Sequence, residues 1–263
     1  MNTQKIIGLF IISLLFTACG SVPLTGRRQM LLVSDAEIIS ASLSQYNDYI
    51  KTAPLSTDKT KTATVERVGK KIATATEAYL KQNGYGSEVA NFQWEFKLVR
   101  DNQVNAFCMP GGKIVVYEGL LPLIASDDEL AVVIGHEVAH AVAKHSNERM
   151  SQALLAQYGG AILNEALSTR SAAMQNIGNT VFGLGTQLGV TLPYSRKHEL
   201  EADHMGLIFM TMAGYNPRSA ISFWQKMSTN GGGTLEILST HPSDGNRIAQ
   251  MQKLLPEMEK YKP

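Results

Sequence analysis

The chain is most constrained by residues 136–140, His-Glu-Val-Ala-His, an H-E-x-x-H run within an apolar, helix-prone segment. On a helix, His136 and His140 lie about 40° apart around the axis, so both imidazole rings project from one face. Two imidazoles at this spacing can bind one Zn²⁺ at roughly 2.0–2.1 Å. Glu137 is turned by about 100° from His136, too far to be a ligand but well placed to take a proton from water at the metal. The run therefore predicts a catalytic metal site with Glu137 as its general base.

The residues around this run favour a helix. Ser126-Asp127-Asp128-Glu129 has the pattern of a capping box, with Ser126 as N-cap, and apolar residues at helical spacing follow it. Two histidines do not complete a catalytic zinc site, which has three protein ligands. The third histidine of the metzincin pattern is absent, because position 143 is Ala and position 146 is Ser. The third ligand must therefore come from elsewhere in the chain.

A later helical segment offers that ligand. Glu199 and Asp203 follow Ser195, four residues apart and on one helical face. Alone, such a pair is typical of a solvated helix surface, but with the H-E-x-x-H run it predicts Glu199 as the third zinc ligand. Asp203, one turn later, would accept a hydrogen bond from a ligating histidine and fix its tautomer.

The first 19 residues have the features of an export signal. Lys5 gives a minimal positive start, residues 6–16 are apolar but too few to span a bilayer, and small residues precede Cys19. The segment resembles a bacterial lipoprotein signal, in which Cys19 is acylated and becomes the first mature residue. Gly20 and Ser21 are not the acidic residues that retain lipoproteins at the inner membrane, which favours the outer membrane. Ordinary secretion and an uncleaved anchor are the alternatives.

Length and composition fit one globular domain. The chain has 263 residues, 44% of them hydrophobic, enough for a sizeable core. We expect residues 20–33, with the turn Leu24-Thr25-Gly26-Arg27-Arg28, to be a tether and residues 34–263 to be a single domain. The net charge of +1 provides no basic field, so we expect no nucleic-acid partner. If Cys19 carries lipid, Cys108 has no disulfide partner, and we expect a small buried strand residue rather than a nucleophile.

Strand patterns are confined to residues 91–117. Apolar residues alternate from Phe92 to Leu98, and residues 104–109 and 113–117 flank Pro110-Gly111-Gly112 as in a hairpin. Helices are expected at about 34–50 and 58–82. The predicted fold class is α+β, mainly helical with a small antiparallel sheet before the H-E-x-x-H helix. This sheet either only packs that helix or also offers an edge strand to an extended peptide substrate.

The other segments and histidines have less specific patterns. His145 is five residues after His140, about 500° around a continuous helix, so we expect it at the surface. His198 and His204 each flank a carboxylate by one residue and should point elsewhere. Residues 150–192 are expected to be packed helices over the site, with a mobile flap or a membrane-touching hairpin as alternatives.

In combination, these motifs resemble one family. The pairing of His136-Glu137-x-x-His140 with Glu199-x-x-Ala202-Asp203 is similar to the gluzincin zinc metallopeptidases of the HtpX and Oma type, the family that also holds the CAAX prenyl endopeptidase. Asn105-Ala106-Phe107, Pro110-Gly111-Gly112 and His241-Pro242 followed by Arg247 also resemble theirs. The similarity extends from about residue 24 to about residue 255. It is closest to the soluble periplasmic lipoprotein branch, because the membrane spans of the other branches are not found in this sequence.

The resemblance implies a zincin-like fold with one Zn²⁺ per chain, held by His136, His140 and Glu199. It also implies that His241 and Arg247 lie near the zinc and stabilise the transition state. Two other roles for His241 stay open: a loop histidine without a catalytic role, or a fourth zinc ligand that displaces the catalytic water and holds the enzyme latent. The substrate would lie along the edge strand at Asn105, Ala106 and Phe107.

The expected function is that of a zinc metalloendopeptidase of the bacterial cell envelope, acting on misfolded or misassembled envelope proteins. We expect it in the periplasm, anchored by the lipid on Cys19 to the outer membrane. The main alternative is an envelope chaperone or assembly factor with a structural or latent zinc site. An idle lipoprotein with a fortuitous motif is a further alternative, and it predicts no bound metal.

Overall fold

The computed structural model describes residues 19–155, 194–230, 236–241 and 245–263. The export signal up to residue 18 and most of the segment 150–192 lie outside the described residues. The strands are β1 (Cys19–Ser21), β2 (Arg28–Met30), β3 (Glu95–Val99), β4 (Ala106–Met109) and β5 (Lys113–Tyr117). The helices are α2 (Asp35–Thr52), α3 (Lys59–Gln82), α4 (Gly86–Val89), α5 (Asp127–Val142), α8 (Arg196–Met212), α9 (Ser219–Asn230), α10 (Glu236–Thr240) and α11 (Gly245–Leu254), with 3₁₀ turns η1 (Glu118–Leu123) and η2 (Leu255–Tyr261). The α+β class, mainly helical, is confirmed.

The central sheet has the strand order β3-β5-β4. β4 and β5 form the expected antiparallel hairpin, and Gly111 and Gly112 turn the chain with φ of 89° and 83°. β3, however, pairs parallel with β5, so the prediction of a purely antiparallel sheet is wrong. After β3 the chain crosses to the far edge of the sheet and forms β4. It then turns back and forms β5 between the two, parallel to β3 and antiparallel to β4. Alternating apolar residues indicate a half-buried strand but do not specify its neighbour, which is why the parallel pair was missed.

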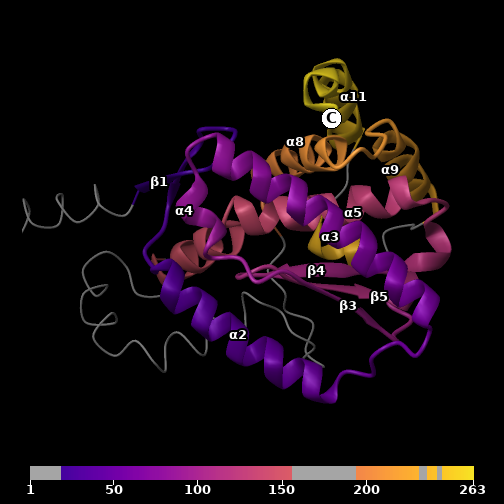
Figure 1. Ribbon diagram of the computed structural model, residues 1–263, viewed down its shortest axis with the longest axis horizontal. Helices are drawn as coiled ribbons and strands as arrows, with labels where there is room; N and C mark the ends of the chain where they lie inside the picture. Colours follow the sequence, from indigo (N-terminus) through magenta and orange to yellow (C-terminus); the bar gives the residue numbers. More distant parts are fainter. Residues whose placement is uncertain (1–18, 156–193, 231–235, 242–244) are drawn as a thin grey trace, which may run out of the picture.

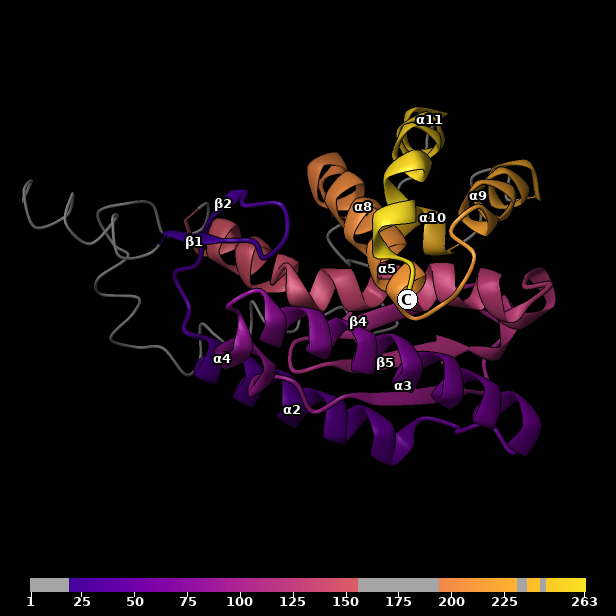
Figure 2. The same cartoon turned by 45° about the horizontal axis from the view of Figure 1, so that its top comes forward.

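The sheet is covered on both faces, and for this reason β5 is buried along its whole length. Ile114 and Val116 belong to the large core cluster with α3 and α5, whereas Val115 and Tyr117 pack with Ile38 and Tyr46 on the other face. Figures 1 and 2 show α2 on the side of the sheet opposite to α5, and α8, α9 and α11 beyond α5. The helix α5 therefore lies in the middle of the molecule.

Two glycines let α5 and α8 approach each other closely. A Cβ on Gly206 would lie 3.0 Å from the backbone N of His136, and one on Gly135 would lie 3.0 Å from the carbonyl oxygen of Gly206. The start of α5 is fixed by Ser126, whose Oγ accepts a hydrogen bond from the Glu129 N–H. The Glu129 carboxylate reaches Ala125 N–H instead of the N-cap N–H, so the predicted capping box is only half formed. Nearly every residue of α5 is buried.

The helix α5 ends at Val142 and does not continue through His145. Lys144 has a positive φ of 56°, a left-handed conformation that ends the helix, and a new helix begins at residue 145 and is described to residue 155. Lys144 is held there by ion pairs of 2.6 Å to Asp35 and 2.7 Å to Glu88. The prediction that His145 lies at the surface assumed a continuous helix. It is wrong, because the break turns His145 into the interior, where it is fully buried.

Part of the expected tether is folded onto the rest of the molecule. β1 and β2 pair antiparallel, Val22 between them is fully buried, and Arg27 reaches carboxylates on distant helices. The division of the chain at residues 19 and 33 otherwise stays a prediction. Within the described residues, no helix combines the length and the apolar character that crossing a bilayer requires.

Candidate metal centre

Three predicted ligands converge between α5 and α8. The Nε2 atoms of His136 and His140 are 3.0 Å apart, as their i,i+4 spacing on one helical face requires. The Glu199 carboxylate comes from the first turn of α8, with its oxygens 3.3 Å from His136 Nε2 and 3.4 Å from His140 Nε2. All three side chains are buried. Ser195 caps α8 and so fixes the start of the helix that carries Glu199.

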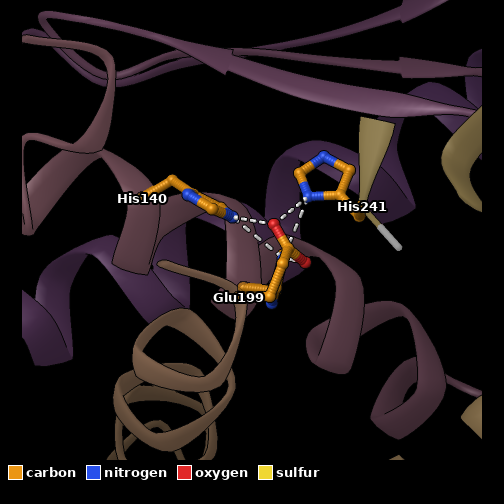
Figure 3. Close-up of side chains that lie close together, drawn as sticks. His140, Glu199 and His241 are labelled. Atoms are coloured by element: carbon orange, nitrogen blue, oxygen red, sulfur yellow. Dashed lines mark hydrogen bonds and ion pairs between the residues drawn. The ribbon is translucent and has the colours of Figure 1, made fainter. Parts of the chain in front are cut away.

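His241, at the end of α10, joins this cluster (Figure 3). Its Nδ1 lies 3.0 Å from Glu199 Oε1 and 3.2 Å from His136 Nε2, and the ring is buried. The four donor atoms lie within 4.8 Å of one another. The sequence prediction that His241 lies near the zinc ligands agrees with this position, while the predicted role as a transition-state donor stays a prediction.

The chemistry of this cluster fits zinc. Three imidazole nitrogens and a carboxylate oxygen are ligands that Zn²⁺ takes, and ligands at about 2.0–2.1 Å from a tetrahedral ion lie roughly 3.3 Å apart. The spacings of 3.0–3.4 Å between donor atoms of His136, His140 and Glu199 are close to that value. Without a metal ion, the burial of ring nitrogens and a carboxylate that all face one point would cost free energy. The cluster is therefore consistent with one zinc ion per chain.

Glu137 lies beside the cluster without joining it. Its Oε1 is 3.5 Å from His241 Nε2, and its Oε2 is buried with no hydrogen-bond partner among the described residues. Burial raises the pKa of Glu137 above its ordinary value, although His241 and His136 nearby and a hydrogen bond from the Cys108 backbone oppose this rise. A carboxylate with a free oxygen and a raised pKa has the properties of a general base.

Asp203 and Arg247 support one side of the cluster. Asp203 Oδ1 is 3.1 Å from Nδ1 of His136, the nitrogen that faces away from the other ligands. Burial lowers the pKa of His136, but Glu199 and Asp203 outweigh that effect and raise it to about 9, and a more basic ring is a better zinc ligand. Arg247 holds Asp203 through Nε at 2.7 Å and Nη2 at 2.6 Å, and its Nη1 lies 2.9 Å from Glu199. The guanidinium also stacks on Trp224, 4.4 Å from the ring centre.

On the other side of the cluster, sequence reasoning missed several residues. His145 Nδ1 lies 2.8 Å from His140 Nδ1, and His145 Nε2 lies 2.9 Å from Glu201. Burial lowers the pKa of His145 to about 4, so its ring is neutral near pH 7. His198 was expected to point elsewhere, and it does lie off the cluster, with Nε2 3.1 Å from Glu148. The sequence signal that was available is a third histidine five residues after the H-E-x-x-H run. The helix break that turns this histidine inward is seen only in the structure.

Strand β4 carries the predicted substrate residues past the cluster. Ala106 and Phe107 pair with β5 and Asn105 precedes the strand, with its side chain accepting a hydrogen bond from Ala106 N–H. β4 is an edge of the described sheet, and it packs on α5. Cys108 is a buried residue of the same strand, as predicted.

Comparison with known proteins agrees with this geometry. Residues 59–255 match the model of Peptidase family M48. The chain is 36% identical over 174 residues to the mitochondrial metalloendopeptidase OMA1 of Schizosaccharomyces pombe, covering 65% of this chain and 49% of that protein. It is 43% identical over 168 residues to OMA1 of Arabidopsis thaliana, covering 64% of this chain and 33% of that protein. It is 28% identical over 177 residues to the beta-barrel assembly-enhancing protease of Yersinia pestis, covering 64% of this chain and 36% of that protein.

The chain thus spans between a third and a half of the length of these three relatives. The matched range contains the H-E-x-x-H helix α5, the Glu199 helix α8 and both His241 and Arg247. With its His-His-Glu zinc-binding set intact, the chain belongs to peptidase family M48.

Proposed function

We propose that the protein is a zinc-dependent endopeptidase. The observation that carries this proposal is the position of Glu137, a buried carboxylate with a free oxygen between the ligand cluster and edge strand β4. A purely structural zinc site has no use for such a group, since its four protein ligands leave no place for water. His136, His140 and Glu199 would hold the metal, which when bound supplies the Lewis acidity that activates water and polarises a carbonyl.

Glu137 would carry the protons of the reaction. Its free Oε2 takes the proton of the attacking water, and the same carboxyl group then gives that proton to the amine that leaves. Its raised pKa suits both steps, because the group must bind and release a proton near neutral pH. Asp203 orients His136, and the contacts of Arg247 with Asp203 and Glu199 support a role in holding these carboxylates rather than in donating to the oxyanion.

An extended peptide would add to the sheet at β4. Backbone groups on an edge strand can recognise a peptide by its main chain, which suits a peptidase with many substrates. Residues 105–107 would align the peptide. The hydrogen bond between the Cys108 backbone and Glu137 places the general base beside the same strand. The expected substrates are therefore unfolded segments that can become extended.

His241 has two candidate roles that make opposite forecasts. As a donor to the oxyanion, it would contribute only in the transition state, so His241→Ala would lower kcat by about 10²–10³ with little change in KM. As a fourth zinc ligand, it would hold the enzyme latent, and His241→Ala would raise proteolysis. The Nδ1 position, 3.0 Å from Glu199 and 3.2 Å from His136, supports the ligand role. Activity measured at equal zinc content separates the two.

The test of the proposed activity is cleavage of casein by the zinc-loaded protein. Glu137→Gln keeps the size of the side chain and removes the base, so it should abolish cleavage while zinc content stays near one per chain. Glu199→Ala should lose most of the zinc. If the wild-type protein holds zinc without cleaving casein, and the Glu137→Gln variant suppresses aggregation of an unfolded client as well as wild type does, the chaperone or assembly-factor alternative is correct instead.

We further propose that the protein works in the bacterial cell envelope as a lipoprotein, on misfolded or misassembled envelope proteins. The lipoprotein-like signal ending at Cys19 supports this, as does the similarity to a protease named for enhancing β-barrel assembly. Cys19→Ala should move the protein from the membrane fraction to the soluble fraction or leave its signal uncleaved. The substitution removes the residue that would carry the acyl chains, and stable anchoring needs more than one such chain. Unchanged membrane fractionation with normal signal cleavage would contradict the lipid anchor. The outer membrane is the expected location, and no nucleic-acid partner is expected.

A further inference from the structure

The two ring nitrogens of His140 have different partners. Nε2 faces the ligand cluster, 3.0 Å from His136 Nε2, while Nδ1 faces His145 Nδ1 at 2.8 Å. A neutral imidazole has one N–H donor and one acceptor nitrogen. If His140 Nε2 offers its lone pair to a metal, its Nδ1 must carry the hydrogen and donate to His145. His145 then carries its own hydrogen on Nε2, which lies 2.9 Å from Glu201 Oε2.

Only one arrangement of hydrogens satisfies all of these contacts. Glu201 accepts from His145, His145 accepts from His140, and His140 is left with a lone pair on Nε2. His145 is fully buried and Glu201 is 7% exposed, so water does not readily replace either partner. The direction of each hydrogen bond is therefore set by the carboxylate at the far end, Glu201.

Glu201 is held in turn by the N-terminal hairpin. Thr25 Oγ1 donates to its Oε1, and Arg27 Nε donates to its Oε2 at 2.6 Å. The rest of the Arg27 guanidinium forms a two-pronged contact with Glu148, at 3.0 Å and 2.7 Å. Arg27 thereby fixes Glu201 and the helix that begins at His145 in one geometry, since a bidentate pair restricts orientation as well as distance.

We propose that His145 and Glu201 are positioning residues that orient the zinc ligand His140, and that Thr25 and Arg27 of the N-terminal hairpin complete this relay. The proposal rests on the zinc site of the proposed function but not on peptidase activity. It makes the hairpin between Cys19 and Met30 part of the metal centre. A purely structural network would instead stabilise the fold and leave zinc affinity unchanged.

The test measures zinc affinity of the full chain by competition with a chelator of known affinity at fixed pH. His145→Phe removes both ring nitrogens and keeps most of the volume, and Glu201→Gln removes the charge but keeps an acceptor for the His145 N–H. We expect His145→Phe to weaken zinc binding by about 10–100-fold, and Glu201→Gln to weaken it by less. If His145→Phe does not fold, the affinity of Glu201→Gln decides. Values within twofold of wild type in the folded variants would overturn the proposal.

The double variant gives a sharper test. In a relay, Glu201 acts on the metal only through His145, so Glu201→Gln should cost no further zinc affinity once His145 has been replaced by Phe. Independent losses that multiply would contradict the relay. The absorption spectrum of the cobalt-substituted protein provides a second readout, which should shift in His145→Phe because the ligand His140 is reoriented.

A matched control uses a histidine outside the relay, His204 on α8. His204 is 29% exposed at its side chain and lies 3.8 Å from Glu257, which is not part of the relay, so His204→Phe should keep wild-type zinc affinity. Arg27→Met tests the hairpin, with an expected loss of affinity smaller than that of His145→Phe and larger than that of His204→Phe. A wild-type protein that binds zinc but does not cleave casein would contradict the proposed peptidase and leave the relay standing.

Discussion

The two imidazole ligands of the metal centre are supported in different ways. His136 is backed directly by the carboxylate of Asp203, which is clamped by Arg247. His140 is backed by a second imidazole, His145, and among the described residues it reaches a carboxylate on that side of the ring only through His145. The direct support comes from α8 and α11, whereas the indirect support depends on a hairpin at the start of the chain.

The residues that support the two ligands also differ in how far apart they lie along the chain. Asp203 lies one helical turn after Glu199, so a single helix presents both a ligand and the partner of another ligand. Arg27, in contrast, is 121 residues from Glu148 and 174 residues from Glu201. The carboxylate behind His136 is thus placed by the same helix that carries the ligand Glu199, whereas the outermost support behind His140 depends on docking of the N-terminal hairpin.

The largest expected effect comes from the direct side. Asp203→Ala removes the carboxylate behind His136. The buried Arg247 contacts two carboxylates of the metal centre, Asp203 and Glu199, and keeps only Glu199 of these two in the variant. Breaking a buried ion pair from one side costs about 3–5 kcal/mol of unfolding free energy. Zinc affinity should fall by about 10–100-fold. Urea unfolding of the zinc-free protein and chelator competition measure the two losses.

Asp203→Asn is the control for this variant. It keeps the volume and one acceptor for Arg247, so its losses should be smaller than those of Asp203→Ala. If Asp203→Ala lowers stability no more than Arg27→Met does, the two sides of the centre have equal weight and the contrast between direct and indirect support is wrong.

The same contrast explains what could be predicted from the sequence. The helical period determines that His136 and His140 share one face and that Glu199 and Asp203 share another. The need of a catalytic zinc for a third protein ligand is what made their convergence an expectation. The strands near residues 95–117 and the hairpin turn were recognised for the same local reason. The parallel pairing of β3 with β5 was not, because pairing partners depend on how the chain crosses the sheet.

The indirect side could not be predicted by these means. The position of His145 depends on the left-handed conformation of Lys144, a residue that is not glycine and gives no turn signal in the sequence. Lys144 is held by Asp35 and Glu88, which come from two other helices. The interior position of His145 is therefore a consequence of tertiary contacts, as is the folding of the expected tether around Arg27.

A second prediction concerns the close packing of α5, which carries both imidazole ligands, against α8. Gly206→Ala would place a Cβ 3.0–3.1 Å from backbone atoms of Gly135 and His136, so α5 must shift away from α8. The expected cost is about 1–3 kcal/mol, reduced by the better helix propensity of alanine. Because Glu199 belongs to α8 and both histidines to α5, zinc affinity should fall regardless of the support behind each ring.

Gly245→Ala is the matched control, because a Cβ there meets nothing within 4 Å. It should leave stability unchanged or slightly increased, by up to about 1 kcal/mol. Unfolding curves of the two alanine variants in chelator, together with zinc titrations, make the comparison. Equal stability of both variants would mean that the helices can separate without cost.

A third prediction concerns acid stability of the indirect side. Burial raises the pKa values of Glu148 and Glu201, but hydrogen bonds from His198 and Arg27 to Glu148, and from His145, Thr25 and Arg27 to Glu201, outweigh it and lower both to about 2, from an ordinary value of 4.5. Groups with a lowered folded pKa stabilise the fold fully above their unfolded pKa. Their contribution is lost as the pH falls from about 4.5 to about 2.

Arg27→Met should flatten this acid-induced loss. Without the guanidinium, the two carboxyl groups titrate closer to their ordinary pKa, so unfolding free energy should depend on pH less steeply between about 4.5 and 2, by roughly 1–2 kcal/mol over that range. The measurement uses zinc-free protein in chelator, because protonated histidines release the metal in the same range. An unchanged pH profile would contradict the Arg27 contacts.

The smallest expected effect comes from an arginine that resembles Arg27 only in its chemistry. Arg67, on α3, lies 2.7 Å from Asp127 in the first turn of α5, so this pair joins the H-E-x-x-H helix itself to another element. Its side chain is 56% exposed, against 12% for Arg27. Water and salt screen an exposed pair, and such pairs contribute little. Arg67→Met should therefore lower Tm by at most about 2 °C at low salt and not at all in about 1 M NaCl, with wild-type zinc affinity. A large loss of zinc affinity in Arg67→Met would mean that an exposed arginine bound to α5 supports the metal as well. The buried contacts through Glu201 and His145 would then not be specific in their effect on zinc affinity.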